Sequence, residues 1–436
     1  MIKIPRFAKK RLLKHWLSSD SRLVFFRYNG EHVDTQDIDN LYLHIPFCRN
    51  TCPYCPYYKE KYDKDKAVRF EKALLAEIRQ HAPWLTEKSI QSLYIGGGTP
   101  TLLNDLLRQV VDRLRGVFTI EKVAIETNPE EITPETIRTL QYIGCNLLSL
   151  GIQDFHQKHL DLLGRTYTPA QARQAIDKAL ETGFETVNLD FIFAYPGQTL
   201  QELDQTLHLA IGTGARQLTF YPLFTFPYST IGRFRKLEKV AMPGKHLRKR
   251  MYYHLCQTLT ASGYRQVSVW SFHKGGGAKY SSVTRDRFLG LGPSAGTYTG
   301  KQFLFNTFNT EDYLTQTPLG KLPFAYMMDV PPALERLFWV YWRLYETIIP
   351  TEDYKRLFNR DFYRDFKSWI HLARLLGYLD SGRHPSGRST YPPNLVINKK
   401  GIHQIHLLQN HFALDFINKI WSSCTETPVP EEVTLI

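Results

Sequence analysis

From residue 40 onward, short apolar runs alternate with longer stretches in which apolar residues recur at helical spacing. The short runs predict strands at residues 41–45, 92–96, 123–127, 147–152, 186–193 and 217–222. The longer stretches predict helices at residues 64–80, 105–117, 134–143, 169–182 and 200–211. Such alternation is typical of a parallel sheet with covering helices. Six strand–helix units are fewer than the eight of a closed barrel.

After about residue 331 the pattern becomes mainly helical. It predicts helices at residues 334–345, 352–358 and 365–376, a short strand and turn at 395–401, and a last helix over 402–421. A chain of 436 residues can form a large core and two domains. We therefore divide it into an N-terminal arm (1–39), an α/β barrel (40–300), a linker (301–330) and a small, mainly helical C-terminal domain (331–436).

The first 20 residues combine six basic side chains with apolar residues at approximate helical spacing. We favour an arm that packs on the barrel. The alternative is a basic amphipathic helix, which would give the protein peripheral contact with an anionic membrane surface.

The whole chain is basic, with 55 Lys and Arg against 42 Asp and Glu and a net charge of +13. This excess suggests acidic partners, whether nucleic acid, anionic lipid, a carboxylate-bearing substrate or an acidic electron donor. No apolar run reaches the length of about 18 residues that a spanning helix needs. The N-terminus lacks a signal-peptide core, and six cysteines in so long a chain do not suggest a disulfide framework, so we expect a reducing cytoplasm.

Three of the six cysteines, Cys48, Cys52 and Cys55, are spaced Cys-x3-Cys-x2-Cys directly after the first predicted strand. Thiolates suit zinc or an iron–sulfur centre. A zinc site usually needs four protein ligands, and no fourth Cys or His follows at finger-like spacing. Three ligands would leave one iron of a [4Fe–4S] cluster open. A structural zinc loop or a redox pair is the alternative. The isolated cysteines at 145, 256 and 424 are interpreted as small hydrophobic residues.

The cysteine spacing, with Tyr54 before the last cysteine, resembles the cluster loop of the radical S-adenosylmethionine (SAM) enzymes. The preceding Tyr42-x-His44-Ile45-Pro46-Phe47 resembles one branch, the oxygen-independent coproporphyrinogen III oxidase (dehydrogenase)-like family. That family also includes heme chaperones and class C methyltransferases. The resemblance implies a partial (β/α)6 barrel, a [4Fe–4S] cluster on the three cysteines, and one or two SAM molecules. Cleavage of SAM would yield a 5′-deoxyadenosyl radical that abstracts hydrogen from the substrate.

The resemblance also implies site residues, most of which fall at predicted strand ends. Tyr42 and Glu126 are the expected catalytic residues, and Glu126 would contact the methionine part of SAM. The cofactor-binding set comprises Tyr42, Tyr54, Gly97, Gly98, Thr99, Glu126, Gln153, Arg165, Asp190 and Gly296. Within it, Gln153, Arg165 and Asp190 match positions that hold a second SAM in the dehydrogenase. Any one of these residues alone could equally have a structural role.

Two further features have a structural and a functional interpretation. The basic run at residues 232–251 is either a solvated face or a docking surface for flavodoxin or ferredoxin, the electron donor that the cluster needs. The histidines at 403, 406 and 411 suggest a metal site, but we favour packing or surface roles for them.

The substrate is less defined. We expect coproporphyrinogen oxidase-like chemistry, in a monomer without a nucleic-acid partner, on a tetrapyrrole or related substrate. The alternatives are C-methylation of an aromatic or lipid-quinone acceptor, and heme carriage without turnover. Tyr57 stands where the true dehydrogenase has a further cysteine, which favours a relative of that enzyme. The segment from Tyr280 stands where heme chaperones commonly carry a His-Asn pair, which disfavours carriage.

Overall fold

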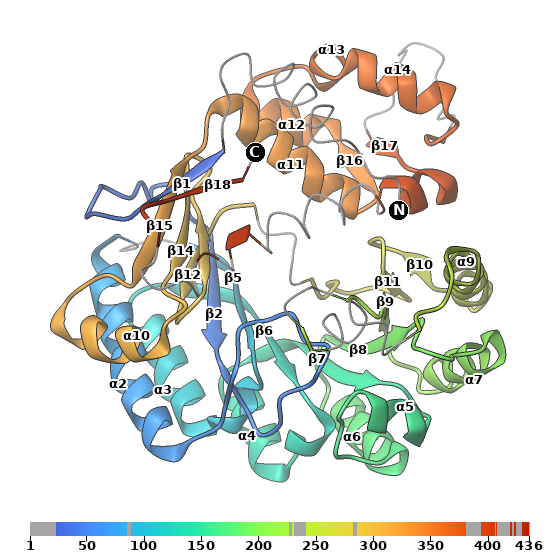
Figure 1. Cartoon of the computed structure of the whole chain (residues 1–436), viewed down its shortest axis with the longest axis horizontal. Helices are drawn as coiled ribbons and strands as arrows, with labels where there is room; N and C mark the ends of the chain where they lie inside the picture. The colour runs from blue at the N-terminus through green and yellow to red at the C-terminus, as the bar shows by residue number, and fades with distance from the viewer. Residues whose placement is uncertain are drawn as a thin grey trace.

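The structure is a computed structural model. It describes residues 23–84, 89–225, 229–230, 241–281, 286–380, 394–405, 407, 419–420, 423 and 430–435. One 14-stranded sheet dominates this part of the chain, in the order β10-β11-β9-β8-β7-β6-β5-β2-β12-β13-β14-β15-β1-β18 (Figure 1). The N-terminal residues 1–22 and most of the predicted last helix, 402–421, lie outside the described residues.

The six predicted strands form the parallel part of this sheet. They are β2 (Asn40–Ile45), β5 (Ser89–Gly97), β6 (Thr119–Thr127), β7 (Cys145–Gln153), β8 (Thr186–Phe193) and β9 (Gln217–Pro222). The five predicted helices are α2 (Lys64–His81), α3 (Asn104–Arg115), α4 (Pro134–Tyr142), α6 (Pro169–Glu181) and α7 (Leu200–Ile211). They cover the outer face of the curved sheet in Figure 1, which confirms the predicted partial barrel.

A seventh parallel strand, β12 (Phe288–Leu291), pairs with β2. An antiparallel extension continues from it through β13 (Gly296–Tyr298), β14 (Gln302–Asn306), β15 (Phe324–Asp329), β1 (Val24–Arg27) and β18 (Glu432–Thr434). The prediction of a linker at 301–330 is therefore wrong, because this segment supplies β14, α10 (Thr310–Gln316) and β15. At the opposite edge, β11 (Ser271–His273) and β10 (Arg265–Gln266) follow β9.

A buried carboxylate joins the barrel to this extension. Glu77 on α2 accepts hydrogen bonds from the Gly292 backbone N–H (2.8 Å), the Asn306 side-chain amide (2.9 Å) and the Tyr313 hydroxyl (2.6 Å). Its side chain is fully buried, and burial raises the pKa of Glu77 to about 7. These bonds hold the turn after β12 against the barrel.

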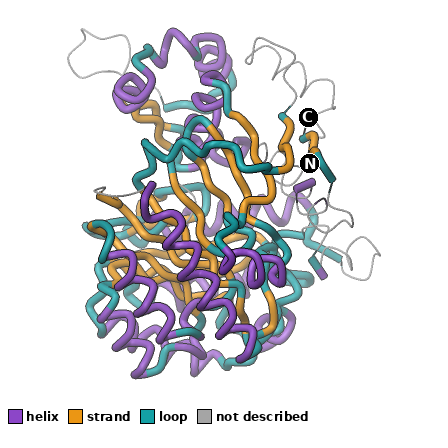
Figure 2. Tube along the Cα trace, turned by 90° about the vertical axis from the view of Figure 1, so that its left-hand side faces the viewer, coloured by secondary structure: helices purple, strands orange, loops and turns teal. Residues whose placement is uncertain are grey.

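The C-terminal helices have a small core of their own. They are α11 (Pro332–Tyr345), α12 (Thr351–Phe358), α13 (Phe362–Asp365) and α14 (Lys367–Leu375), and a strand pair, β16 (Ile348–Pro350) and β17 (Asn394–Val396), accompanies them. They stand apart from the barrel helices, as the side view in Figure 2 also shows.

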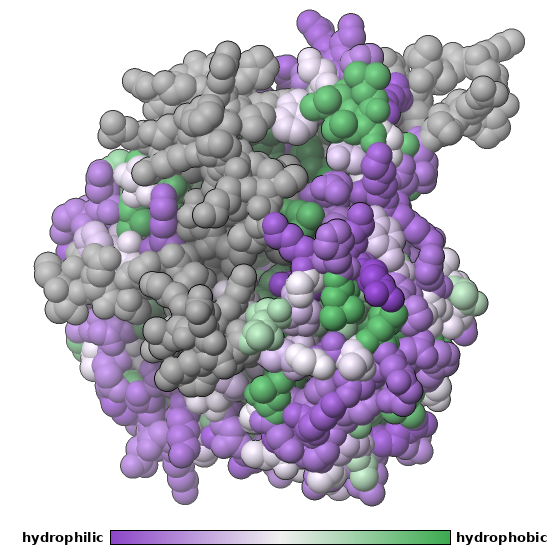
Figure 3. Space-filling view, turned by 45° about the vertical axis from the view of Figure 1, so that its right-hand side comes forward, coloured by the Kyte–Doolittle hydropathy of each residue, from purple (hydrophilic) through white to green (hydrophobic). Residues whose placement is uncertain are grey.

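On α14, the apolar side chains of Trp369, Leu372 and Leu375 are exposed. Hydrophobic residues also gather on the upper part of the face in Figure 3. None of the described helices has the length and apolar character needed to cross a membrane.

Candidate active site

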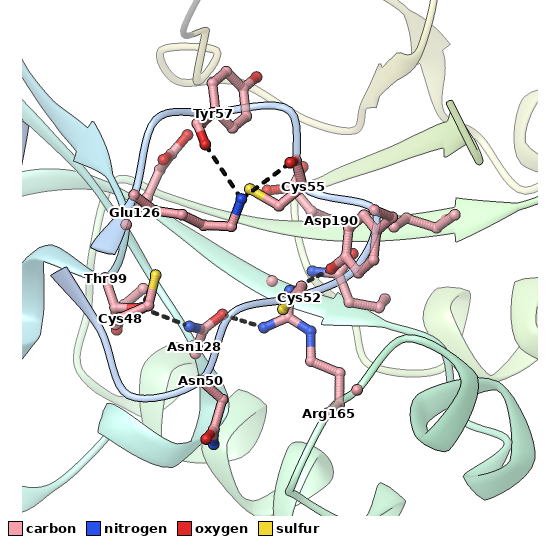
Figure 4. A pocket seen from close by; sticks show the side chains of 18 of the residues that line it. Cys48, Asn50, Cys52, Cys55, Tyr57, Thr99, Glu126, Asn128, Arg165 and Asp190 are labelled. Carbon is pink, nitrogen blue, oxygen red and sulfur yellow. Dashed lines mark hydrogen bonds between the residues drawn. The ribbon is translucent and has the colours of Figure 1, made fainter. Parts of the chain in front are cut away.

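A cavity of about 280 Å³ opens at the carboxyl ends of the parallel strands. Parallel barrels place their functional residues at this end, because the loops that follow the strands converge there. All but two of the predicted site residues line the cavity, namely Cys48, Cys52, Tyr54, Cys55, Gly97, Gly98, Thr99, Glu126, Gln153, Arg165 and Asp190. Figure 4 shows several of them projecting from different strands toward one another.

Hydrogen bonds hold the cysteine loop at its base, where it begins and ends, and at its tip, near Cys55 and Tyr57. Two short strands, β3 (Phe47–Cys48) and β4 (Glu60–Lys61), pair in parallel at the base. At the tip, the Lys59 ammonium donates to the carbonyl oxygens of Cys55 (3.0 Å) and Tyr57 (3.3 Å). The loop therefore has a defined shape built from the chain's own contacts.

His44 connects the loop to β2 and defines the role of Tyr42. Its Nε2 lies 3.0 Å from the Tyr58 carbonyl oxygen, which can only accept, so Nε2 carries the proton. Nδ1 therefore accepts from the Tyr42 hydroxyl, 2.7 Å away. Burial lowers the pKa of His44 to about 4, which keeps the ring neutral. Tyr42 thus directs its proton to His44 and does not line the cavity.

The glycine turn after β5 packs directly against the cysteine loop. The Gly98 N–H donates to the Ile45 carbonyl (2.8 Å), and the Thr99 N–H donates to the Phe47 carbonyl (2.7 Å). A Cβ atom at Gly98 would lie 2.4 Å from the Phe47 oxygen. At Gly97, a φ of +118° adds a backbone conformation that disfavours side chains. These glycines are therefore required by the fold of the cavity wall, whatever ligand they also contact.

A chain of hydrogen bonds runs from the cysteine loop across the cavity floor (Figure 4). The Thr99 hydroxyl donates to the Cys48 sulfur (3.7 Å) and accepts from the Asn128 amide (2.9 Å). Arg165 then donates to the Asn128 Oδ1 (2.9 Å) and to the Tyr54 hydroxyl (2.5 Å). Sequence reasoning did not assign Asn128, although it lies two residues after Glu126 in the same strand-end motif.

Arg165 and Asp190 are charged side chains of opposite sign that the described chain leaves without ionic partners. Arg165 forms no ion pair with a described acidic residue, and its buried Nε has no hydrogen-bond partner there. Asp190 accepts from the Ser149 hydroxyl (2.5 Å) and the Asn188 amide (3.0 Å) but pairs with no described cation. Burial raises the pKa of Asp190 to about 6. A ligand with both anionic and cationic or hydroxyl groups would complement this pair. SAM has such groups, so the residues fit it.

Glu126 is held by two tyrosines that sequence reasoning also left unassigned. The Tyr94 hydroxyl donates to Glu126, and the Tyr280 hydroxyl donates to that of Tyr94 (3.0 Å). Tyr94 also stacks on Tyr42, with ring centroids 5.7 Å apart. Glu126 and Tyr280 both line the cavity, so this network orients a carboxylate toward bound ligand.

The cysteines fit a cluster better than a single metal ion. Burial raises the pKa of Cys48 to about 11 and also raises that of Cys55, so their thiolate forms need a bound cation. The three sulfur atoms do not all lie within 4.8 Å of one another. A single tetrahedral zinc would need sulfur atoms about 3.8 Å apart. A wider spacing suits a centre with several irons.

Among the described residues, one other trio, Asp154, His156 and His159, has metal-ligand spacing. Both imidazole Nδ1 atoms lie 2.8 Å from the Asp154 carboxylate. The Asp154 carboxylate is therefore already hydrogen-bonded to both imidazoles. His403 stacks on Tyr253 at 5.6 Å, whereas His406, His411 and Cys424 lie outside the described residues.

The last predicted cofactor residue, Gly296, lies on β13 and does not line the cavity. A Cβ atom there would contact the Phe305 ring at 3.5 Å, in the antiparallel extension. Of the basic run, residues 231–240 lie outside the described part. The remainder includes exposed Lys245, Lys249 and Arg250 on α9 (Lys245–Ala261).

Part of the chain matches a known superfamily. Residues 42–210 match the radical SAM superfamily. The chain therefore carries a radical SAM domain, and this family implies a [4Fe–4S] cluster and SAM.

Three relatives of known name show which branch of this superfamily the chain resembles. The heme chaperone HemW of Bacillus subtilis is 27% identical over 281 residues, which cover 63% of this chain and 74% of that protein. The HemW of Mycobacterium tuberculosis is 29% identical over 296 residues, 65% of this chain and 76% of its own. The oxygen-independent coproporphyrinogen III oxidase of Pseudomonas aeruginosa is 27% identical over 306 residues, 65% of this chain and 66% of its own. These relatives confirm the family that the cysteine motif predicts.

The fold also matches a solved structure, that of the coproporphyrinogen III oxidase HemN of Escherichia coli. The TM-score is 0.74 at 22% identity, and the match covers 89% of this chain and 94% of that one. The predicted radical SAM barrel architecture is therefore confirmed.

Proposed function

We propose that this protein is a coproporphyrinogen oxidase-like radical SAM enzyme that acts on a tetrapyrrole. One observation carries the proposal. The three cysteines line the same cavity at the carboxyl ends of the barrel strands as Arg165 and Asp190, neither of which forms an ion pair with a described residue. This charge pattern beside a cluster loop fits bound SAM, which turnover would need.

In this proposal Cys48, Cys52 and Cys55 would hold three irons of a [4Fe–4S] cluster, and SAM would occupy the same cavity. Bound together, the two groups supply radical chemistry able to remove hydrogen from an unactivated carbon. The protein's residues bind and orient. Glu126, held by Tyr94 and Tyr280, would take the SAM amino group, and Arg165 and Asp190 would bind the ionic and hydroxyl groups of SAM. Exposed Lys245, Lys249 and Arg250 on α9 would attract an acidic electron donor.

Two other functions have specific support. The names of the relatives in B. subtilis and M. tuberculosis favour a heme chaperone. The presence of Gln153, Arg165 and Asp190 in one cavity is compatible with a second SAM and hence with C-methylation. All three functions would use the same cluster loop, so they must be distinguished by their reaction products.

Product analysis of the anaerobically reconstituted protein with SAM, a reductant and coproporphyrinogen III tests the proposal. We expect 5′-deoxyadenosine together with stepwise loss of carbon dioxide from the tetrapyrrole. S-adenosylhomocysteine beside 5′-deoxyadenosine would instead show a methyltransferase. Tight heme binding with neither product would show a chaperone, and either result would overturn the decarboxylation reading.

The role of Asp190 predicts a pH-dependent SAM affinity. Its carboxyl has a pKa of about 6, so it is ionised at pH 8 and mostly protonated at pH 5. Replacing Asp190 with asparagine should weaken SAM binding about tenfold at pH 8, because a charge-assisted hydrogen bond is lost. At pH 5 the parent should itself bind weakly, so the two proteins converge.

Calorimetric titration with SAM at both pH values measures this effect. The control is Asp177→Asn, which removes an exposed carboxylate that pairs with Arg173 on the outer helix α6. It should leave SAM affinity unchanged at both pH values. A loss in Asp190→Asn that is equal at pH 5 and pH 8 would contradict a role for the ionised carboxylate.

A further inference from the structure

A hydrogen-bond chain crosses the floor of the cavity, from a cationic side chain to the sulfur of a predicted cluster ligand. Arg165 donates to Asn128 (2.9 Å), Asn128 donates to Thr99 (2.9 Å), and Thr99 donates to the Cys48 sulfur (3.7 Å). Figure 4 shows Thr99, Asn128 and Arg165 joined in this order beside Cys48. The hydrogen-bond chain therefore links an arginine of the expected SAM site to the cysteine loop.

Chemistry alone fixes the direction of each bond. A guanidinium can only donate, so Asn128 must present its amide oxygen to Arg165 and its NH2 group to Thr99. The Thr99 oxygen then accepts from Asn128, which leaves the Thr99 proton for its other neighbour, the Cys48 sulfur. Every bond thus points from the arginine toward the cysteine.

Both ends of the hydrogen-bond chain are held in place by other contacts. The guanidinium carbon of Arg165 lies 5.8 Å from the ring centroid of Tyr54 and 5.9 Å from that of Tyr167. Arg165 also donates to the Tyr54 hydroxyl (2.5 Å). At the other end, Thr99 is buried, and its N–H donates to the Phe47 carbonyl (2.7 Å). The positive charge and the final donor therefore have defined positions.

Such a donor has a physical consequence for an iron–sulfur cluster. Hydrogen bonds to the sulfur atoms are among the factors that set the reduction potential. Reduction adds negative charge, so a donor to sulfur binds more strongly in the reduced state and favours it. Hydrogen bonds in series polarise one another. Thr99 is therefore a stronger donor with Asn128 and Arg165 behind it than it would be alone.

We propose that Thr99 and Asn128 form a relay that raises the reduction potential of the cluster and couples it to the charge of Arg165. Thr99 donates to the ligand sulfur, and Asn128 is a positioning residue that acts through Thr99. The inference rests on the proposed function, because it takes the three cysteines to hold a cluster.

Potentiometric titration of the anaerobically reconstituted protein without SAM tests the relay. The electron paramagnetic resonance signal of the reduced cluster is followed. In Thr99→Val the equilibrium constant for one-electron reduction should fall about tenfold, which lowers the midpoint potential by about 59 mV. Asn128→Ala should lower this constant about threefold, because Thr99 keeps its bond to sulfur but loses its polarising partner. Thr99→Ser keeps the hydroxyl and should match the parent.

Combined variants distinguish a relay from independent local effects. Because Asn128 acts through Thr99, adding Asn128→Ala to Thr99→Val should lower the potential no further. Arg165→Gln should likewise lower the potential less in the Thr99→Val protein than in the parent. Additive shifts in these combinations would show direct electrostatic effects on the cluster and would overturn the relay.

The matched control is Thr101→Val, in the same turn. Thr101 is also buried, but its hydroxyl pairs with that of Thr127 (2.6 Å), and it does not line the cavity. This variant should keep the potential of the parent. A potential that is unchanged in Thr99→Val, or shifted equally in Thr101→Val, overturns the proposal.

Iron and sulfide per chain, measured for every variant, separate the two levels of failure. If the parent itself binds no cluster, the proposed function fails before any variant is compared. If the parent binds a cluster and the variants share its potential, only the relay fails. Should Thr99→Val bind less iron, Asn128→Ala decides, because its printed side-chain hydrogen bonds go to Thr99 and Arg165 and to no cysteine of the described chain.

Discussion

Replacing Cys52 with alanine should remove the iron–sulfur cluster and lower turnover by at least ~10³-fold, comparable to the loss of a complete catalytic group. Three cysteines line the cavity, and the described residues provide no substitute thiol there. Two remaining ligands cannot hold a cluster that already has one open iron. The fold itself should survive, because Cys52 is only partly buried and the group that accepts from the Cys55 N–H is its backbone carbonyl, which alanine keeps.

Iron and sulfide per chain, with the electron paramagnetic resonance signal of the reduced protein, measure this loss independently of activity. The control is Cys256→Ala, which removes a buried thiol on α9 far from the cysteine loop in sequence. It should keep full iron content and lose about 1 kcal/mol of stability. Normal iron content in Cys52→Ala would show that the three cysteines are not the cluster ligands.

The second large effect concerns stability. Replacing Glu77 with alanine should lower the free energy of unfolding by about 3–5 kcal/mol, because it leaves buried donors unsatisfied and opens a void. The Gly292 N–H and the Tyr313 hydroxyl would lose their acceptor, and the Asn306 amide would keep only its bond to the Gly292 carbonyl. Two of these lie on β14 and α10, so the antiparallel extension should loosen from the barrel first.

The same residue predicts a pH dependence with a definite sign. Burial raises the pKa of Glu77 to about 7 from 4.5, so the folded state holds the proton more tightly than the unfolded state. This contribution to stability is complete below pH 4.5 and is lost as the pH rises through 7, by up to about 3 kcal/mol. Urea denaturation of the cofactor-free protein between pH 5 and 8 measures it. Glu77→Gln, which has no charge to bury, should show a flatter profile than the parent. Parallel profiles for the two proteins would refute the assignment.

The barrel strands and their helices could be predicted because each element has its own signal. A strand buried on both faces, such as β8, reads as a continuous apolar run, and a covering helix such as α7 reads as an amphipathic repeat. The short strand β12 has only four residues, including Gly290, and its partner β2 is about 250 residues away in sequence. A strand this short, with a partner this distant, shows no recognisable pattern in the local sequence. For the same reason the sequence predicts a linker where β14 and β15 lie.

The amino-acid sequence was enough to predict the cluster loop, because the spacing of its three cysteines is a local pattern. The resemblance carried by the cysteine motif named Glu126, Arg165 and Asp190, and the structure places all three in one cavity with Cys48. The partners of those side chains, by contrast, follow from how the whole chain folds. In the folded chain the Tyr42 hydroxyl donates to His44, and Gly296 lies beside Phe305. Arg165 and Asp190 have no ionic partners among the described residues. Such pairings depend on side-chain directions across residues far apart in sequence, and no local pattern encodes them.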